Sequence, residues 1–209
     1  MKRRVIGLIG NKESGKSTTA RLIKEQFPTA QEVMLAGHLK RVLSEVFSLP
    51  LRIFEDQELK EKEILPNLIL EKDIIQAIFK AFSMNLTEET LKKHLDKEFK
   101  TTRKIMQYVG TDVLRAIDPD IHLKWALKNV EAPLLIISDI RFPNEFDYFK
   151  NNTLFLSVGI SRIQNKEKDL HSSEIQIEKM IEGCDVILKN NKDLEFFKEQ
   201  IKISVFPKI

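Results

Sequence analysis

The residues with the clearest chemical potential lie near the start of the chain, where the sequence fits the pattern GxxxxGKS. The glycines of this pattern let the backbone wrap around an anion, so that successive N–H groups point at the α and β phosphates of a nucleotide. Lys16 then reaches the β and γ phosphates, and Ser17 offers its hydroxyl to a magnesium ion. The predicted nucleotide ligands are Gly10, Asn11, Lys12, Glu13, Ser14, Gly15, Lys16, Ser17 and Thr18.

A glycine-bearing surface turn is the alternative interpretation of this segment, and its flanks argue against it. The apolar run Val5–Ile9 precedes the segment, as a buried strand would. Apolar residues at helical spacing follow it, from Ala20 to Phe27. A phosphate loop lies between a buried strand and a helix, and this order of elements is the expected one.

A carboxylate and a guanidinium follow the most apolar run of the chain, residues 134–138. Asp139 at the end of this predicted strand is placed to hold magnesium, directly or through water, together with Ser17. Arg141 has a planar fork that suits a phosphate or a carboxylate. The alternative for Asp139 is an aspartate that begins a turn.

Two further sets of polar residues are candidates, the first for binding a second, phosphorylated substrate and the second for stabilising the transferred phosphoryl group. Arg103, Gln107 and Arg115 interrupt an otherwise apolar helical pattern, in which Gln107 could pair with the edge of a base. Arg162 opens a polar stretch after the fourth apolar run, and it could move onto the transferred phosphoryl group. The alternatives are ordinary surface residues for the first group, and a helix start with a capping box at Ser173 for the region after Arg162.

The pattern of the whole chain predicts the elements that must position these residues. Apolar, β-prone runs recur at 4–9, 32–36, 133–138, 153–159 and 184–188, with helical periodicity between them. This alternation predicts an α/β fold with a central parallel sheet of about five strands flanked by helices. The stretch from 48 to 131 lacks a convincing strand and predicts a helical insertion. Within it we expect a helix capped by Thr87 and another restarting at Asp118 and Pro119.

Composition limits the class of protein. The chain has 209 residues, is 42% hydrophobic and carries 34 basic against 31 acidic side chains, for a net charge of +3. This balance is not the footprint of a nucleic-acid-binding protein, and no apolar run is long enough for a membrane span. The single cysteine, Cys184, predicts neither a disulfide nor a metal cluster, but a small buried side chain where a late strand begins. We therefore expect a cytoplasmic protein with no membrane or nucleic-acid partner.

Several blocks together resemble the deoxynucleoside monophosphate kinases of tailed bacteriophages, and the resemblance extends over nearly the whole chain. The blocks are GNKESGKST, LAGHLK at 35–40, RKIMQYVGTDVLRAIDPDIHLKWA at 103–126, SDIRFPNE at 138–145, DLHSSE at 169–174 and CDVILKNN at 184–191. The match is weakest between about 50 and 100. This chain has Gly37-His38 before Leu39-Lys40, where the family usually carries an Asp-Pro pair.

The resemblance implies a phosphate-loop nucleotide kinase fold, ATP and Mg²⁺ as cofactors, and a deoxynucleoside 5'-monophosphate as acceptor. It implies a single kinase domain over 1–209, with an acceptor-binding helical insertion at about 49–131 and a lid at about 160–173. Lys16, Arg141 and Arg162 are the predicted catalytic residues. The predicted acceptor-binding residues are Lys40, Arg103, Gln107, Arg115, Arg141, Glu145, His171 and Glu174.

Other interpretations stay open at this point. The chain could be a phosphate-loop kinase for another small phosphorylated metabolite, or a nucleic-acid-dependent ATPase. A GTP-driven switch is disfavoured, since the sequence has neither NKxD nor a DxxG after the second apolar strand. The Gly37-His38 departure also leaves room for a nucleotide-binding structural protein. A homodimer is one option for the assembly, and a phage-encoded enzyme would act in the host cytoplasm.

Overall fold

The computed structural model describes residues 3–162 and 172–209, and in the second range it describes side chains from residue 176 onward. The chain forms two compact units. The sheet unit comprises residues 1–35 and 129–209, and the helical unit comprises residues 36–128. Each unit has a hydrophobic core of its own.

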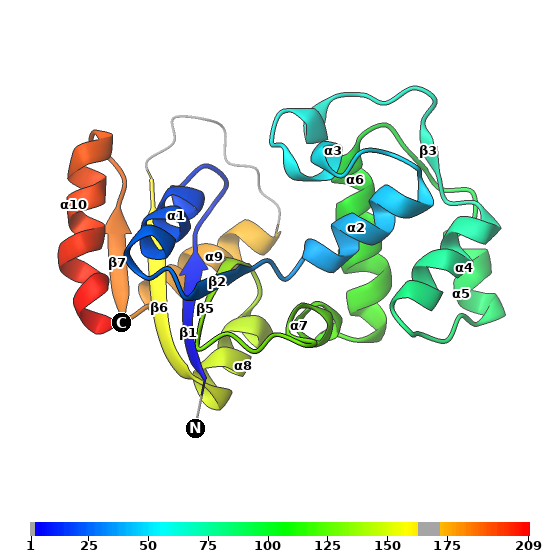
Figure 1. Ribbon diagram of the computed structural model, residues 1–209. Coiled ribbons are helices and arrows are strands. Elements are labelled where there is room, and N and C mark those ends of the chain that lie inside the picture. Colours follow the sequence, from blue (N-terminus) through cyan, green and yellow to red (C-terminus); the bar gives the residue numbers. More distant parts are fainter. Residues whose placement is uncertain (1–2, 163–171) are drawn as a thin grey trace. The chain divides into compact units, whose positions relative to one another are not determined.

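The sheet unit is built on five parallel strands in the order β2-β5-β1-β6-β7 (Figure 1). Their bounds are β1 Arg4–Ile9, β2 Ala30–Val33, β5 Leu134–Ile140, β6 Leu154–Ser161 and β7 Val186–Lys189. The predicted α/β class with a five-stranded parallel sheet is confirmed. The second strand was expected at 32–36 and begins earlier, because Ala30 packs in the core while the chain after Val33 has already left the sheet.

Helices cover both faces of this sheet. The bounds are α1 Lys16–Gln26, α8 Pro143–Asn152, α9 Ser172–Glu182 and α10 Leu194–Ser204, with a short 3-10 helix at Phe206–Lys208. Helices α1 and α10 contact each other on one face, and α8 and α9 contact each other on the other face (Figure 1). Ile6, Leu8, Ile136 and Val158 are nearly inaccessible between these layers. This packing fixes the strand ends from which the candidate residues project.

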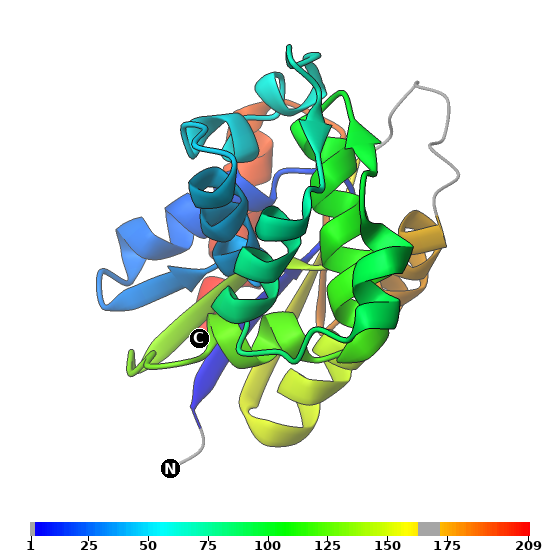
Figure 2. The same cartoon turned by 90° about the vertical axis from the view of Figure 1, so that its right-hand side faces the viewer.

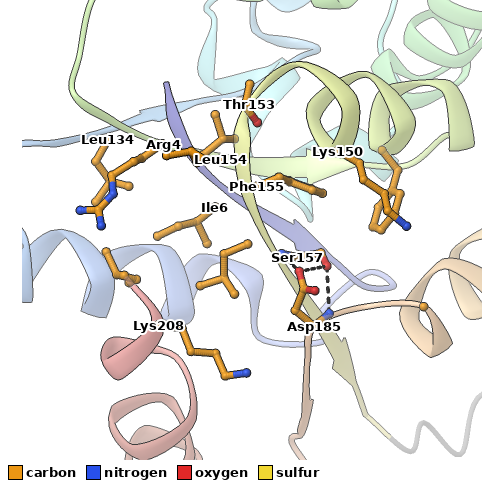
Figure 3. A pocket seen from close by; sticks show the side chains of 15 residues that line it. Arg4, Ile6, Leu134, Lys150, Thr153, Leu154, Phe155, Ser157, Asp185 and Lys208 are labelled. Atoms are coloured by element: carbon orange, nitrogen blue, oxygen red, sulfur yellow. Dashed lines mark hydrogen bonds between the residues drawn. The ribbon is translucent and has the colours of Figure 1, made fainter. Parts of the chain in front are cut away.

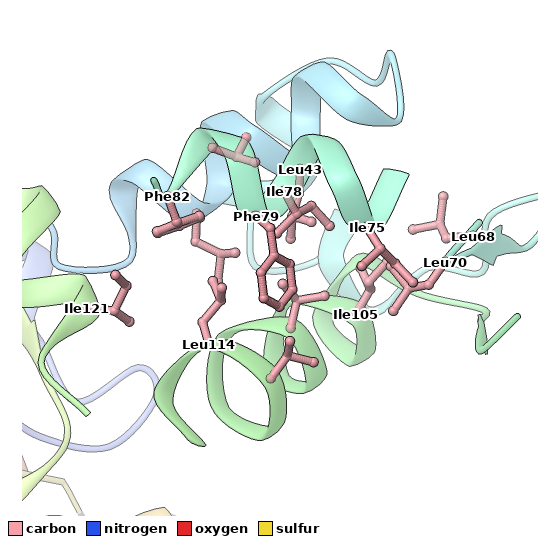
Figure 4. Packing of buried hydrophobic residues seen from close by; sticks show 14 of the residues in the cluster. Leu43, Leu68, Leu70, Ile75, Ile78, Phe79, Phe82, Ile105, Leu114 and Ile121 are labelled. Atoms are coloured by element: carbon pink, nitrogen blue, oxygen red, sulfur yellow. The ribbon is translucent and has the colours of Figure 1, made fainter. Parts of the chain in front are cut away.

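The helical unit consists of short helices (Figure 2). They pack around one apolar cluster, which includes Leu43, Phe79, Ile105 and Leu114 (Figure 4). Its elements are α2 Gly37–Val46, α3 Arg52–Glu55, η1 Leu59–Glu61, β3 Leu68–Ile69, α4 Lys72–Ala81, α5 Glu88–His94, β4 Glu98–Phe99, α6 Thr102–Gln107, a π-helix η2 Tyr108–Arg115 and α7 Ile121–Ala126. Strands β3 and β4 pair in antiparallel register.

Three local predictions for this unit have different outcomes. Thr87 caps α5, since its side chain accepts the N–H of Thr90. No buried strand was expected here, and the unit contains only the short strands β3 and β4, whose two residues each are too few for a visible alternation. The helix expected to restart at Asp118 begins only after Asp120, because the Asp118 carboxylate instead accepts the Asp120 N–H at 3.1 Å and the Lys124 ammonium at 2.6 Å.

Cys184 lies between α9 and β7 and is half-buried. Its Sγ donates to the carbonyl of Met180 at 3.2 Å. Burial raises the pKa of this thiol to about 12, against a smaller opposing effect of Ser157. The thiol therefore stays protonated at neutral pH and acts as a small packing residue.

Candidate functional site

The phosphate-loop segment connects β1 to α1 at the carboxyl end of the sheet. Ser14 donates its N–H to the carbonyl of Asn11 at 3.2 Å, which closes a turn, and Glu13 has a positive φ of 60°. Gly15 has a φ of 119°, and a Cβ there would lie 2.9 Å from both the amide nitrogen of Asn190 and the ring of Phe197. Only glycine fits such a position, so the last glycine of the motif has a conformational and a steric cause.

The Lys16 side chain folds back over this loop. Its Nζ donates to the carbonyl oxygens of Gly10 at 2.6 Å and Asn11 at 2.7 Å. The ammonium is thereby held against the loop whose amides are expected to bind phosphate. Ser17 and Thr18 follow in the first turn of α1, where the positive end of the helix dipole adds to the field.

Two side chains from the far half of the sheet also reach the loop. Arg162, directly after β6, donates to the carbonyl of Glu13 at 3.2 Å. Asn190, directly after β7, donates its side-chain amide to the carbonyl of Ser14 at 2.8 Å. Sequence analysis singled out Arg162 but missed Asn190. The signal available for Asn190 was its place at the end of a predicted strand, where parallel sheets gather functional side chains.

Asp139 lies next to an irregularity in the sheet. Gly7 pairs with Ile137 and Ile9 pairs with Ile140, so β5 has one residue more than β1 over this stretch. Such bulges re-aim side chains near functional sites. The Asp139 carboxylate accepts the N–H of Leu35 at 2.7 Å, and so holds the chain after β2 against β5. Asp139 therefore has a structural role that the sequence did not reveal.

Arg141 and Glu145 form a turn after β5. The Glu145 carboxylate is 3% exposed and accepts the N–H groups of Arg141 at 2.9 Å and Phe142 at 3.1 Å. Glu145 thus fixes the backbone that presents Arg141, whereas its predicted contact with the acceptor stays a prediction. The Arg141 guanidinium is exposed and makes no ion pair or hydrogen bond within residues 3–162 and 172–209. It is available to an anionic ligand.

Four further residues that were predicted to bind the acceptor lie in the helical unit. Arg103 on α6 pairs with Glu61 and donates to Gln57 at 3.2 Å, while Gln107 at the end of α6 is exposed. Arg115 ends the π-helix η2 and is half-buried. Lys40 on α2 is 9% exposed. The structure brings Lys16 and Arg162 to one loop, but Arg103, Gln107 and Arg115 belong to a different unit from these residues.

His38, at the family's Asp-Pro position, stacks on an aromatic side chain in the same unit. Its ring lies 4.4 Å from that of Trp125 with an interplanar angle of 7°, and its Nε2 lies 3.2 Å from the carbonyl of Ala81. Phe82 packs edge-on against the His38 ring at 4.7 Å. Burial lowers the pKa of His38. The packed, neutral ring therefore stands where the resemblance expects the proline of the pair, and Gly37 stands where it expects the aspartate.

Two predicted residues, His171 and Glu174, cannot be placed in this site. His171 lies outside the described residues. Glu174 lies in α9, and its side chain is outside the described part. Their predicted contacts with the acceptor stay predictions.

The two residues predicted to hold Mg²⁺ have the chemistry that a hard cation prefers. The Ser17 hydroxyl and the Asp139 carboxylate are oxygen ligands, which Mg²⁺ prefers. Among the residues the structure describes, no group of three or more His, Cys, Asp or Glu side chains could hold a metal. Few protein ligands are what a magnesium ion needs when phosphates supply the rest. Within the same described ranges, no helix is both long and apolar enough to cross a membrane.

Comparison with known proteins places the chain in a family. Residues 57–201 match the family described as deoxynucleotide monophosphate kinase. A protein of Acanthamoeba polyphaga mimivirus carries the provisional name deoxynucleotide monophosphate kinase. It is 32% identical over 215 residues, which cover 94% of this chain and 93% of the viral protein.

Solved structures with the same general outline are more distant. The dephospho-CoA kinase of Campylobacter jejuni is 17% identical, covers 96% of this chain and 94% of its own, and has a TM-score of 0.46. The shikimate kinase of Bacteroides thetaiotaomicron is 9% identical over 96% of this chain and 95% of its own, with a TM-score of 0.36. Both are too distant to assign residues. The family match and the viral relative together show that the chain belongs to the deoxynucleotide monophosphate kinase family and is a phosphotransferase that acts on deoxynucleoside monophosphates.

Proposed function

We propose that the chain transfers the γ-phosphoryl group of ATP to a deoxynucleoside 5'-monophosphate, with the phosphate loop as donor site. An oxygen of the acceptor phosphate forms a bond to the γ phosphorus, and the bond from that phosphorus to the β–γ bridging oxygen breaks. ADP leaves with the electron pair. The second pKa of the acceptor phosphate is about 6, so its oxygen is already anionic at neutral pH and needs no general base.

Catalysis by this chain then consists of positioning and neutralising charge. The loop amides and Lys16 hold the donor phosphates, and Arg162 approaches them from β6. Arg141 offers an exposed guanidinium to the acceptor phosphate. The observation that carries this assignment is that Lys16 and Arg162 both donate to carbonyls of the same loop.

We assign the acceptor to the helical unit, through Arg103, Gln107 and Arg115. Arg103 is held by Glu61 and Gln57, so its orientation is set before substrate binds. A pre-ordered guanidinium loses little freedom when it binds a phosphate. This proposal assigns the donor residues to the sheet unit and the acceptor residues to the helical unit.

Mg²⁺ would be held by Ser17 and Asp139, and when bound it supplies positive charge that neutralises the donor phosphates. Replacing Asp139 by Asn keeps an oxygen that can accept the Leu35 N–H but removes the charge. We expect Asp139→Asn to raise the Mg²⁺ concentration needed for half-maximal turnover, while thermal stability stays close to that of the natural chain. An unchanged magnesium dependence would remove Asp139 from the metal site.

The function is tested by following diphosphate formation from ATP with each common deoxynucleoside and ribonucleoside monophosphate. We expect turnover with at least one deoxynucleotide, and no stimulation by added DNA or RNA. Phosphorylation of other metabolites alone would favour the alternative kinase. Arg103→Ala should raise the KM for the acceptor by about ten-fold or more without changing the KM for ATP. Equal changes in both would contradict the separation of sites. Gel filtration tests the predicted homodimer.

A further inference from the structure

A hollow of about 580 Å³ lies in the sheet unit at the end opposite the phosphate loop (Figure 3). Its lining includes Arg4, Leu134 and Leu154, which are the first residues of β1, β5 and β6. The phosphate loop instead follows the last residue of β1. The hollow is therefore distinct from the donor site, and its volume lies in the range of small-molecule sites.

The hollow exists because β7 is shorter than its neighbour. Strand β7 pairs with β6 only from Val158 to Ser161, so within the described ranges no strand covers the edge of β6 at 154–157. Ser157 donates its N–H towards this edge, to Asp185, and the Ser161 carbonyl accepts from Asn190 on the same side. Because alternate residues of a strand direct their peptide groups to the same edge, the N–H and C=O of Phe155 face the hollow.

Charge in the hollow is predominantly positive. Arg4, Lys150 and Lys208 line it, and none of the three forms an ion pair with the part of the chain that the structure describes. The one carboxylate side chain in the lining belongs to Asp185. It already accepts hydrogen bonds from the N–H and the hydroxyl of Ser157, at 2.8 and 2.6 Å. The side chains of the lining therefore include three cations and one carboxylate.

Apolar side chains line both sides of the open β6 edge, together with the polar groups. Phe146 and Phe155 pack edge-to-face with ring centroids 5.4 Å apart on the side of α8, and Ile6 and Leu134 belong to the core on the side of α1. Apolar side chains, an open peptide edge and cationic side chains complement the three parts of a nucleotide. Aromatic rings pack against a base, a backbone N–H and C=O pair with its polar edge, and Lys and Arg bind phosphate.

We propose that this hollow is a second nucleotide-binding site, distinct from the phosphate loop. A bare anion would use only the cationic side chains and leave the apolar side chains and the Phe155 peptide edge unused. An added peptide strand would need a longer edge than the 154–157 segment provides. A nucleotide uses all three features at once. Because the hollow lies at the opposite strand ends from the phosphate loop, a ligand there could be bound while the loop holds its donor nucleotide.

The test is hydrogen exchange of the full chain with and without each of the four common deoxynucleoside triphosphates, at millimolar concentration with Mg²⁺. We expect slower exchange in peptides spanning 153–158 and 183–187, the Phe155 amide included. The nucleotide concentration that gives half-maximal protection should rise by about ten-fold or more in the double variant Lys150→Glu/Lys208→Glu. It should rise less in the double variant Lys150→Gln/Lys208→Gln. Lys179→Glu on α9, an exposed lysine outside the lining, should leave it unchanged.

Three results would overturn the proposal. They are unchanged exchange at 153–158 when the phosphate-loop peptide is protected, equal protection by inorganic phosphate alone, and protection that survives both double substitutions. The phosphate-loop peptide and the turnover assay report the donor site independently. Loss of turnover with continued protection at 153–158 would therefore count against the kinase assignment and not against this site.

Discussion

The two units present their candidate residues in different ways. In the sheet unit, Lys16, Arg162 and Asn190 follow the ends of parallel strands and donate to backbone carbonyls of one loop. In the helical unit, Arg103 and Arg115 project from a helix that changes from α to π geometry. The proposed donor site thus relies on the backbone of one loop, which suits any nucleotide. The proposed acceptor site relies on side chains, which can vary with the substrate.

Removing the Lys16 ammonium should have the largest effect, and it tests the donor half of this comparison. We expect Lys16→Ala to lower kcat by about a thousand-fold or more, equivalent to about 4 kcal/mol of transition-state stabilisation. The ammonium contacts carbonyls of its own loop, so the fold should survive. Steady-state kinetics and thermal unfolding measure the two effects.

Lys24→Ala is the matched control for that variant, since Lys24 lies on the same helix with a side chain that is 47% exposed and paired with Glu32. It should keep the turnover of the natural chain. Normal turnover in Lys16→Ala would remove the phosphate loop from the mechanism.

The second comparison concerns stability, because each unit has its own core. Leu43 in the helical unit and Leu188 in the sheet unit are both almost fully buried. We expect Leu43→Ala and Leu188→Ala each to cost about 3 kcal/mol. The chain's single tryptophan, Trp125, lies in the helical unit, so its fluorescence reports that unit alone, while far-ultraviolet circular dichroism reports both.

If the units unfold separately, Leu43→Ala should shift the fluorescence transition more than Leu188→Ala does. Coincident transitions in both variants would show that the two cores unfold as one cooperative body.

Asn190 provides a smaller effect within the donor site. We expect Asn190→Ala to raise the KM for ATP by several-fold, in line with about 1 kcal/mol for a lost hydrogen bond to the Ser14 carbonyl. Asn152→Ala, which removes a local bond from an exposed side chain to Tyr148, should leave kinetics unchanged. An effect on the KM for the acceptor alone would mean that Asn190 does not act through the loop.

The sequence predicted the sheet unit better than the helical unit, and the reasons are physical. The phosphate loop is a local motif, and parallel strands gather their carboxyl ends without further information. The bulge that aims Asp139 at Leu35 depends on pairing between distant strands, which no local pattern encodes. Asn190 was missed for the same reason, because its partner Ser14 is far away in sequence.

Helical periodicity correctly predicted the helices of the insertion, but not the π-helix. Hydrogen bonds from residue i to i+5 rotate Arg115 relative to the position that an α-helix starting at Thr102 would give it. Gly110 shows why this stretch is special. A Cβ there would lie 2.8 Å from the Leu39 side chain, and its carbonyl lies 3.1 Å from Nε2 of His122. Such close packing depends on tertiary structure, and the only sign of it in the local sequence is the glycine.

The smallest expected effect is a pH dependence of the helical unit, which contains three of the four histidines. Burial is the main cause that lowers the pKa of His38 and of His94. The unfolded chain then takes up protons below about pH 6.5 that the folded unit does not accept, so stability falls as the pH drops below that value. The loss should stay below about 1 kcal/mol because both groups are partly screened by solvent.

Trp125 fluorescence during urea unfolding at pH 7.5 and 5.5 measures this loss directly. His38→Phe keeps a ring against Trp125 but cannot be protonated, so it should reduce the difference between the two pH values. If the natural chain were equally stable at both, or more stable at the lower pH, the histidine rings would not be held neutral by their packing.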